Sequence, residues 1–216
     1  AEDIKSKLSL IDVSNPPTKS GVFEDVKLIA DPGDDILVNP PDTGKTYRLT
    51  LGPDNYSGTS GNDLFDGTLD MAKNVTFNSY DRLSGGDGTD TLIAQGIGNL
   101  TTDVDTLKSV EVIHLVAPTG TNILDLTNTT GVTRIINEAA AAKYTVTGIG
   151  KGIERIDVFS PAGTTQTFKF KSDAVSGSAD SLILGLQSLG TKTKTINIEP
   201  VSGTNGFEIL NIELSG

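Results

Sequence analysis

Glycine and aspartate residues recur between residues 52 and 96 in an order that suits calcium binding. The most complete run is Gly85–Ile93 (GGDGTDTLI), which fills every position of the nonapeptide G-G-x-G-x-D-x-U-x, where U is a large apolar residue. Its glycines permit a tight turn in which carbonyl oxygens approach one point, and Asp90 adds a carboxylate. Calcium takes six to eight such oxygen ligands, so this run predicts a calcium-binding turn with Leu92 pointing inward.

A second, less complete copy is Gly58–Phe65 (GTSGNDLF), in which Thr59 stands where the nonapeptide has its second glycine. Asp63 takes the place of the Asp of the motif. A weaker match, Gly33–Leu37 (GDDIL), has only the second half of the pattern.

Two further aspartates lie nine residues upstream of the motif carboxylates, so that Asp54 forms a pair with Asp63 and Asp81 forms a pair with Asp90. The interval between Asp63 and Asp90 is 27 residues, or three nonapeptides. The intervening register is broken, which predicts an inserted loop around residues 68–78.

Ordinary hairpin turns are the alternative interpretation, because Gly, Asn and Asp are the common turn residues. The net charge of the chain favours the calcium-binding interpretation over plain hairpin turns. It has 28 acidic residues against 17 Lys and Arg, a net charge of −11, so crowded carboxylates need counterions. The same excess of negative charge makes nucleic acid and anionic membranes poor partners.

Residues for catalysis are sparse. The single histidine, His114, lies in an alternating strand pattern without the second histidine or the cysteines of a zinc site. The chain has no nucleophile elbow, P-loop or dinucleotide-binding glycine pattern. Paired carboxylates could serve glycoside hydrolysis, but Trp is absent and there are 4 Tyr, few aromatic platforms for a sugar. We therefore expect no enzyme.

The elements that position these turns are strands, because period-2 alternation dominates from residue 97 onward. A pattern of an apolar residue, Glu, and alternating apolar residues occurs at 110–115, 153–158 and 207–212, with a looser copy at 132–137. The first, looser and second copies follow one another at steps of 22 and 21 residues, which is typical of solenoid coils.

The expected fold is all-β, a parallel β-solenoid or β-roll-like body with Gly-Asp turns, and the alternative is an antiparallel β-sandwich. Three regions are expected: a leading β-containing segment at 1–50, a calcium-binding Gly/Asp region at 51–96, and a repetitive strand region at 97–216 stacked on it. No apolar stretch is long enough to insert into a membrane. Because there is no Cys, the redox compartment stays undecided.

The order of motifs from Asp54 to Leu115 resembles the RTX-type calcium-binding S-layer and large surface proteins of Gram-negative bacteria. In both, a G-T-x-G-N-D turn, an insertion and a D-x-L-x-G-G-x-G-T-D-T-L turn precede V-E-x-I-x-V strands. The resemblance covers about residues 50–216. It implies type I secretion, folding in extracellular calcium, and a place at the bacterial cell surface. Two departures, the small number of nonapeptides and Thr59, favour a few isolated ions over a long β-roll.

Carried over residue by residue, the resemblance implies a set of metal-ligand candidates. They are Asp63 and Asp90 as carboxylates, Gly58, Ser60, Gly85 and Asp87 as sources of backbone or side-chain oxygen, and Asp54 and Asp81 as second choices.

The resulting expectation is a calcium-stabilised structural domain that self-associates through lateral contacts into an S-layer or similar coat. One alternative is a calcium-dependent adhesin that binds a protein or a glycan such as cell-surface polysaccharide. Another is the non-catalytic, secretion-associated domain of an RTX exoenzyme.

Overall fold

The computed structural model describes residues 43–102, 106–116, 121–138, 143–159, 165–187, 195–203 and 206–215. The chain divides into two units, Ala1–Asn39 and Pro40–Gly216, and all described residues belong to the second. The weak motif at Gly33–Leu37 and most of the predicted leading segment therefore lie outside the described residues.

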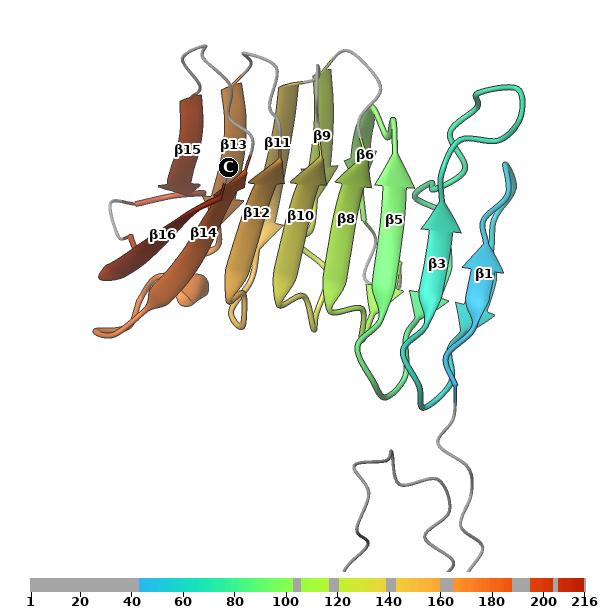
Figure 1. Ribbon diagram of the computed structural model, residues 1–216, viewed down its shortest axis with the longest axis horizontal. Helices are drawn as coiled ribbons and strands as arrows, with labels where there is room; N and C mark the ends of the chain where they lie inside the picture. Colours follow the sequence, from blue (N-terminus) through green and yellow to red (C-terminus); the bar gives the residue numbers. More distant parts are fainter. Residues whose placement is uncertain are drawn as a thin grey trace, which may run out of the picture. The chain divides into compact units, whose positions relative to one another are not determined.

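One long parallel sheet runs through the second unit (Figure 1). Each of its strands comes from a different coil of the chain. In spatial order they are β1 (Thr46–Arg48), β3 (Leu64–Gly67), β5 (Thr91–Gln95), β8 (Val112–Val116), β10 (Arg134–Glu138), β12 (Arg155–Phe159), β14 (Ser181–Gln187) and β16 (Ile209–Ser215).

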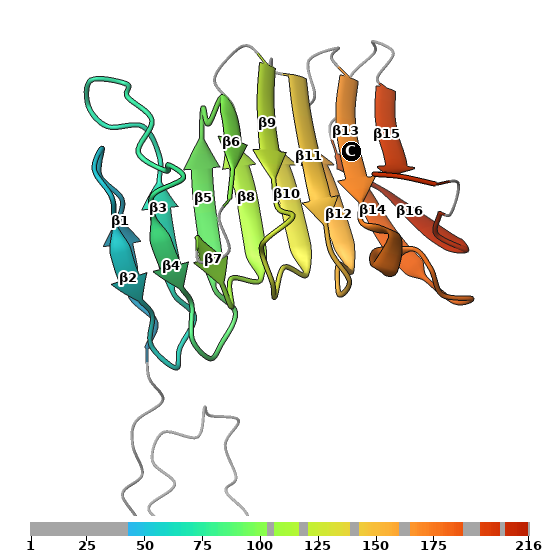
Figure 2. The ribbon, with the colours of Figure 1, turned by 180° about the vertical axis from the view of Figure 1, so that it is seen from behind.

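Two shorter parallel sheets form the opposite side of the coils (Figure 2). The first contains β2 (Asn55–Ser57), β4 (Arg82–Ser84) and β7 (Leu107–Lys108). The second contains β6 (Asn99–Thr101), β9 (Thr121–Asp125), β11 (Lys143–Ile149), β13 (Thr165–Phe170) and β15 (Thr195–Pro200). A 3-10 turn, η2 (Ser172–Ala174), follows β13.

This architecture confirms the predicted parallel β-solenoid, because every described strand pair is parallel. The antiparallel sandwich is wrong for the described residues. Coil length changes along the stack. Equivalent corners are 18 residues apart in the first step, 27 in the second, about 21 or 22 in the middle, and 28 in the last.

The long sheet runs on through the residues where the predicted regions meet. β1, within the predicted leading segment, is the first strand of the long sheet and pairs with β3. At the other predicted boundary β5 pairs with β8, so the long sheet continues across residue 97. The extra residues of the 27-residue coil lie between β3 and β4, where the inserted loop was predicted.

The core consists of inward side chains stacked in rows, one from each coil. The central row of the long sheet is Tyr47, Phe65, Leu92, Ile113, Ile135, Ile156, Leu184 and Ile212. Its members from Phe65 to Ile156 are fully buried. Burying each such side chain stabilises the fold by roughly 1.5–3 kcal/mol, so the stacking of the coils contributes strongly to stability.

Candidate functional site

A ladder of carboxylates lies at the corner where each early coil enters the long sheet. Asp63, Asp90 and Glu111 stand directly before β3, β5 and β8. The backbone N–H of Lys45 donates to Asp63 Oδ1 at 2.6 Å, that of Asp63 to Asp90 Oδ1 at 2.7 Å, and that of Asp90 to Glu111 Oε2 at 2.9 Å. Each carboxylate therefore closes the corner of the coil that precedes it; we call these three residues the corner ladder.

The second-choice aspartates form the same arrangement at the opposite corner. The backbone N–H of Asp54 donates to Asp81 Oδ1 at 2.9 Å, and Asp81 Oδ2 accepts from the N–H of Asn78 at 2.8 Å. Asp54 Oδ2 accepts from the N–H of Thr50 at 2.7 Å. Both carboxylates are thus occupied by backbone donors.

The structure brings together different aspartate pairs from those predicted. Asp63 meets Asp90, and Asp54 meets Asp81, each pair being 27 residues apart. Nine residues correspond to half of the first, 18-residue coil, so the predicted nine-residue partners precede strands of opposite sheets.

The two nonapeptide copies differ at the residue four before the carboxylate. In the incomplete copy, Thr59 donates its N–H to Asp63 Oδ2 at 2.6 Å, and its hydroxyl contacts the same carboxylate. In the complete copy that position is Gly86, with a φ of 103°, and it makes no such bond. Asp90 Oδ2 is consequently buried without a hydrogen-bond partner.

The pKa values of the two carboxyl groups respond to this difference. Burial raises the pKa of Asp90, and the negative charges of Glu111 and Asp63 raise it further. At Asp63 burial also opposes the charge, but the donors from Lys45 and Thr59 outweigh it and lower the pKa. Without a cation, the Asp90 carboxylate is therefore the costlier of the two to ionise.

Glycines let the coils approach at both copies. A Cβ at Gly58 would overlap the carbonyl oxygen of Gly85 and the carboxylate of Asp63. A Cβ at Gly85 would overlap the carbonyl oxygen of Ser109 and Asp90 Oδ2. At Gly85, the carbonyl oxygen of Ser109 and the unpartnered Oδ2 of Asp90 thus lie close to the same point.

The remaining predicted ligands lie outside this point. Ser60 and Asp87 are exposed, whereas Asp90 and Gly85 are buried. Sequence reasoning missed Glu111 as a member of the corner ladder. Its signal was its position directly before a repeat strand, 21 residues after Asp90.

A calcium ion fits the chemistry of the complete copy better than that of the other aspartates. No group of three or more Asp, Glu, His or Cys side chains suited to a metal occurs among the described residues. A site here would instead combine Asp90 Oδ2 with backbone carbonyls such as that of Ser109, ligands that calcium accepts. Asp54, Asp63 and Asp81 would first have to release backbone donors.

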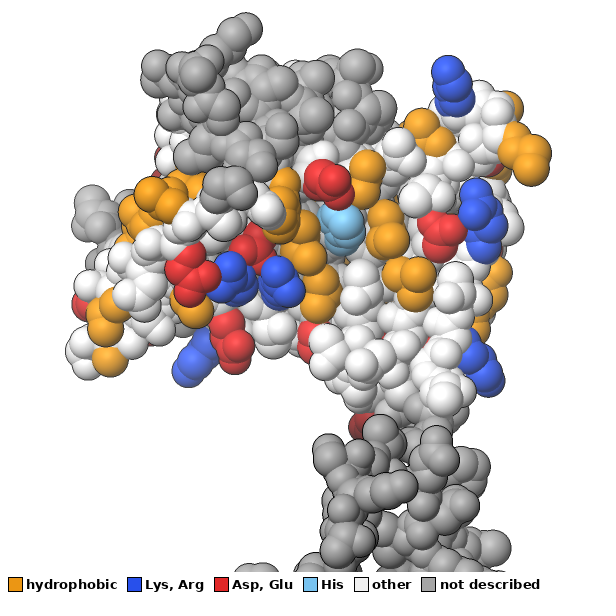
Figure 3. Space-filling model, viewed as in Figure 1, with side chains coloured by type: hydrophobic (Ala, Val, Ile, Leu, Met, Phe, Trp, Pro, Cys, Tyr) orange, Lys and Arg blue, Asp and Glu red, His pale blue; other side chains and the backbone are white. Residues whose placement is uncertain are grey.

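The outward face of the long sheet carries a separate set of charges among apolar side chains (Figure 3). His114 Nε2 lies 2.9 Å from Glu138 Oε2. Asp157, nearly buried, accepts from Arg134 and Arg155, and Arg155 also reaches Glu213 at 2.8 Å. The first interaction joins β8 to β10, and the others join β10 to β12 and β12 to β16.

Comparisons with known proteins add no relative. No protein-family model matches the chain, and neither a curated protein nor a solved structure matches it. In the described part of the chain, no helix has the length and apolar character needed to cross a membrane.

Proposed function

We propose that this chain is a non-catalytic, calcium-stabilised structural domain of a secreted bacterial surface protein that assembles into an S-layer or similar coat. The observation that carries the calcium part is the buried, unpartnered Oδ2 of Asp90 in the one complete nonapeptide. The proposed surface location and the proposed assembly rest on the resemblance of the motif order to RTX-type surface proteins and on the repetitive solenoid fold.

Calcium would act by stabilising the folded corner. The ion would neutralise the charge that Asp90 shares with Glu111 and Asp63, and would supply the missing partner of Oδ2. Binding to the folded form alone stabilises it by about 2.7 kcal/mol at a hundredfold excess over the dissociation constant. The chain would then fold most completely where calcium is abundant, outside the cell.

Titration calorimetry of EDTA-stripped protein with Ca²⁺, beside Mg²⁺, tests this function. We expect saturable, calcium-selective heat that Asp90→Asn abolishes. Asp173→Asn is the matched control, because Asp173 is an exposed aspartate of η2 that is not among the predicted ligands. Unaltered binding by Asp90→Asn, or no heat from the wild type, would refute the calcium site.

Coat assembly needs its own measurement. Light scattering of the wild-type chain should show calcium-dependent growth of large, ordered assemblies, visible by negative-stain electron microscopy. If the chain binds calcium but forms no extended assembly at any concentration, the proposed calcium site stands and the proposed coat assembly is refuted.

A surface hollow favours the adhesin as a second candidate. It has a volume of about 400 Å³ and crosses the three-stranded sheet, where Arg82 and Lys108 lie beside Asn55, Ser57 and Ser84. Such cations suit an acidic glycan. If this candidate holds, an acidic polysaccharide should bind the calcium-loaded monomer, and Arg82→Ser should weaken that binding at least several-fold.

A further inference from the structure

The outward side of the long sheet is rich in apolar residues in its middle strands (Figure 3). These residues are half-buried by their neighbours, whereas the inward apolar residues that alternate with them are buried. We call the outward set the outward apolar face. It consists of Leu64 of β3, Ile93 of β5, Val112 and Val116 of β8, Ile136 of β10, Phe159 of β12 and Ile183 of β14.

Parallel strands with apolar side chains on both faces are normally covered on both faces. Strand β8 has such a sequence, since it reads Val-Ile-His-Leu-Val. The two shorter sheets cover the inner face of the long sheet. Among the described elements, no strand or helix covers the outer face. The sequence of the middle strands therefore suits a second layer that packs on the outward apolar face.

The charges of β10 indicate what that layer is. This strand begins with Arg134 and ends with Glu138, and Ile136 lies midway between them. The side chains of Arg134 and Glu138 are 42% and 57% exposed, so both can reach a second molecule. A strand with a base at one end and an acid at the other complements a copy of itself that runs the opposite way.

We propose that two copies of this chain pack face to face through the outward apolar face. The twofold axis would run parallel to the stacking direction of the coils, over the row of Ile93, His114 and Ile136. Each strand of the long sheet would then lie opposite its own counterpart and antiparallel to it. The two sheets would form a sandwich, a packing in which sheets lie about 10 Å apart.

This orientation matches the middle strands residue by residue. Arg134 of each copy faces Glu138 of the other, and Val112 faces Val116. Ile136 lies on the axis and faces its own counterpart. The match depends on strands in the middle of the sheet and not on its first or last strand. Twofold dimers of this kind are the commonest homo-oligomers.

Asp157 of β12 also lies in the row on the axis, but its charge is already compensated. Its side chain is 5% exposed and accepts from Arg134 at 2.6 Å and from Arg155 at 2.8 Å. The nearly buried carboxylate therefore does not face its counterpart as a bare charge.

The other face-to-face orientation is unfavourable. A twofold axis parallel to the strands and over β10 would place Arg134 opposite Arg134 and Glu138 opposite Glu138. Like charges that face each other across an interface are destabilising. The charges of β10 therefore select the axis along the stack.

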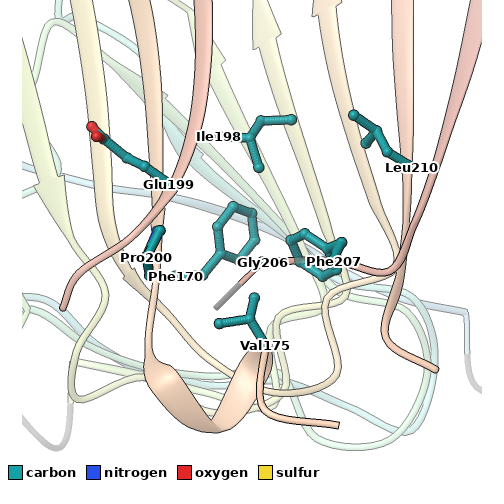
Figure 4. A pocket seen from close by; sticks show the side chains of 8 residues that line it. All are labelled: Phe170, Val175, Ile198, Glu199, Pro200, Gly206, Phe207 and Leu210. Carbon is teal, nitrogen blue, oxygen red and sulfur yellow. The ribbon is translucent and has the colours of Figure 1, made fainter. Parts of the chain in front are cut away.

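A separate apolar cavity lies between the sheets at the last described coils (Figure 4). Its volume is about 230 Å³, and Phe170, Ile198, Phe207 and Leu210 are among its lining residues. Phe170 is a core residue, and Ile198 and Phe207 pack against the core. The cavity thus belongs to the inward packing, and Leu210 is an apolar position outside the outward apolar face.

Sedimentation equilibrium over a range of concentrations, in EDTA and again in calcium, tests the dimer. We expect a species of twice the 22.6 kDa chain mass in both conditions. A dimer that persists in EDTA is independent of the proposed calcium site and coat, so the failure of either does not decide this test. A wild-type monomer at every concentration in both conditions would overturn the proposal, whatever else covers the face.

A double variant, Ile93→Thr with Ile136→Thr, locates the contact. Threonine keeps the β-branched shape that suits a strand but offers less apolar surface, so association should weaken at least tenfold while the chain stays folded. Leu210→Thr is the matched control, because Leu210 is 44% exposed and lies outside the outward apolar face. Equal weakening by the double variant and the control would overturn the proposed interface.

Glu138→Lys tests the charge match. The new lysine would face Arg134 of the other copy at two symmetric places, so association should weaken at least tenfold. Glu199→Lys is the control, since Glu199 of β15 is also a partly exposed acid with a basic partner, Lys169 at 3.5 Å. An equal effect of the two substitutions would contradict the proposed orientation.

Cross-linking tests the same orientation in a second way, because the chain has no cysteine of its own. A mixture of Val112→Cys and Val116→Cys chains should form covalent dimers with a short bis-maleimide, since these positions face each other across the axis. Either variant alone should cross-link much less. If Val112→Cys alone cross-links as well as the mixture, the axis along the stack is wrong.

Discussion

At residue 90 a carboxyl group is held where its negative charge is costly. Asp90 is fully buried, one of its oxygens has no partner, and Glu111 and Asp63 add negative charge nearby. This combination is expensive in the absence of a cation, because a buried polar atom without a partner costs about 1–3 kcal/mol.

The pH dependence of stability in EDTA should show this cost. Because the pKa of Asp90 is raised in the folded state, the unfolded chain loses the proton first as pH rises, and this group's contribution to stability falls until the raised pKa is passed. Asp90→Asn removes the stability lost when Asp90 ionises, so this variant should unfold at a higher temperature than the wild type at pH 7. The difference in unfolding temperature should become smaller towards pH 4. A less stable Asp90→Asn protein at pH 7 in EDTA would contradict this account.

Gly85 makes a second prediction at the residue scale. Gly85→Ala places a methyl group against Ser109 and Asp90 and should lower stability by about 1–3 kcal/mol, the usual penalty of overpacking. Gly52→Ala is the control, because its Cβ would meet nothing closer than 3.9 Å. Urea unfolding of both variants measures the difference. Equal stability of the two would show that the coils can separate there at little cost.

Part of the site could be predicted from residue types alone. The nonapeptide at 85–93 marked Asp90, the carboxylate that the structure leaves with a free oxygen. The predicted pairing of Asp81 with Asp90 was wrong. Whether two residues nine apart lie at the same corner or at opposite corners depends on the coil length, which residue types do not give. Only the folded coil shows that Thr59 donates a hydrogen bond to Asp63 Oδ2, whereas Asp90 Oδ2 has no hydrogen-bond partner.

At the scale of elements, alternation and repeat steps were enough to predict the solenoid. The copies at 110–115, 132–137 and 153–158 occupy equivalent positions in β8, β10 and β12. The copy at 207–212 is offset by two residues, since Asn211 rather than Ile209 continues the row of Arg155. A shift of two keeps every side chain on the same face, so the periodic pattern could not reveal it.

Gly185 allows an interaction that crosses β14. A Cβ there would overlap Asp157 Oδ1 and lie 2.7 Å from Arg155 Nη2, the side chain that reaches Glu213 on β16. Gly185→Ala should therefore destabilise the chain by about 1–3 kcal/mol and speed amide exchange in β16. Glu213→Gln removes only an exposed pair, which is worth at most about 1 kcal/mol. Hydrogen exchange by mass spectrometry should rank the two variants in that order; the reverse ranking would refute it.

On the scale of the whole molecule, each coil contacts only its neighbours, so stabilisation stays local. Calcium at Asp90 should slow amide exchange in β3, β5 and β8, and leave β12 and β14 nearly unchanged. Hydrogen exchange with and without calcium tests this distribution. Uniform protection along the stack would mean that the ion binds elsewhere or that the solenoid opens as one unit.

The corner ladder also gives the stack a direction. The N–H groups of Lys45, Asp63 and Asp90 each donate to a carboxylate on the coil that follows in sequence. A coil added on the N-terminal side of a folded stack therefore finds its acceptor already in place, whereas one added on the C-terminal side leaves its own corner open. The early coils should accordingly fold in order from the C-terminal side towards the N-terminus.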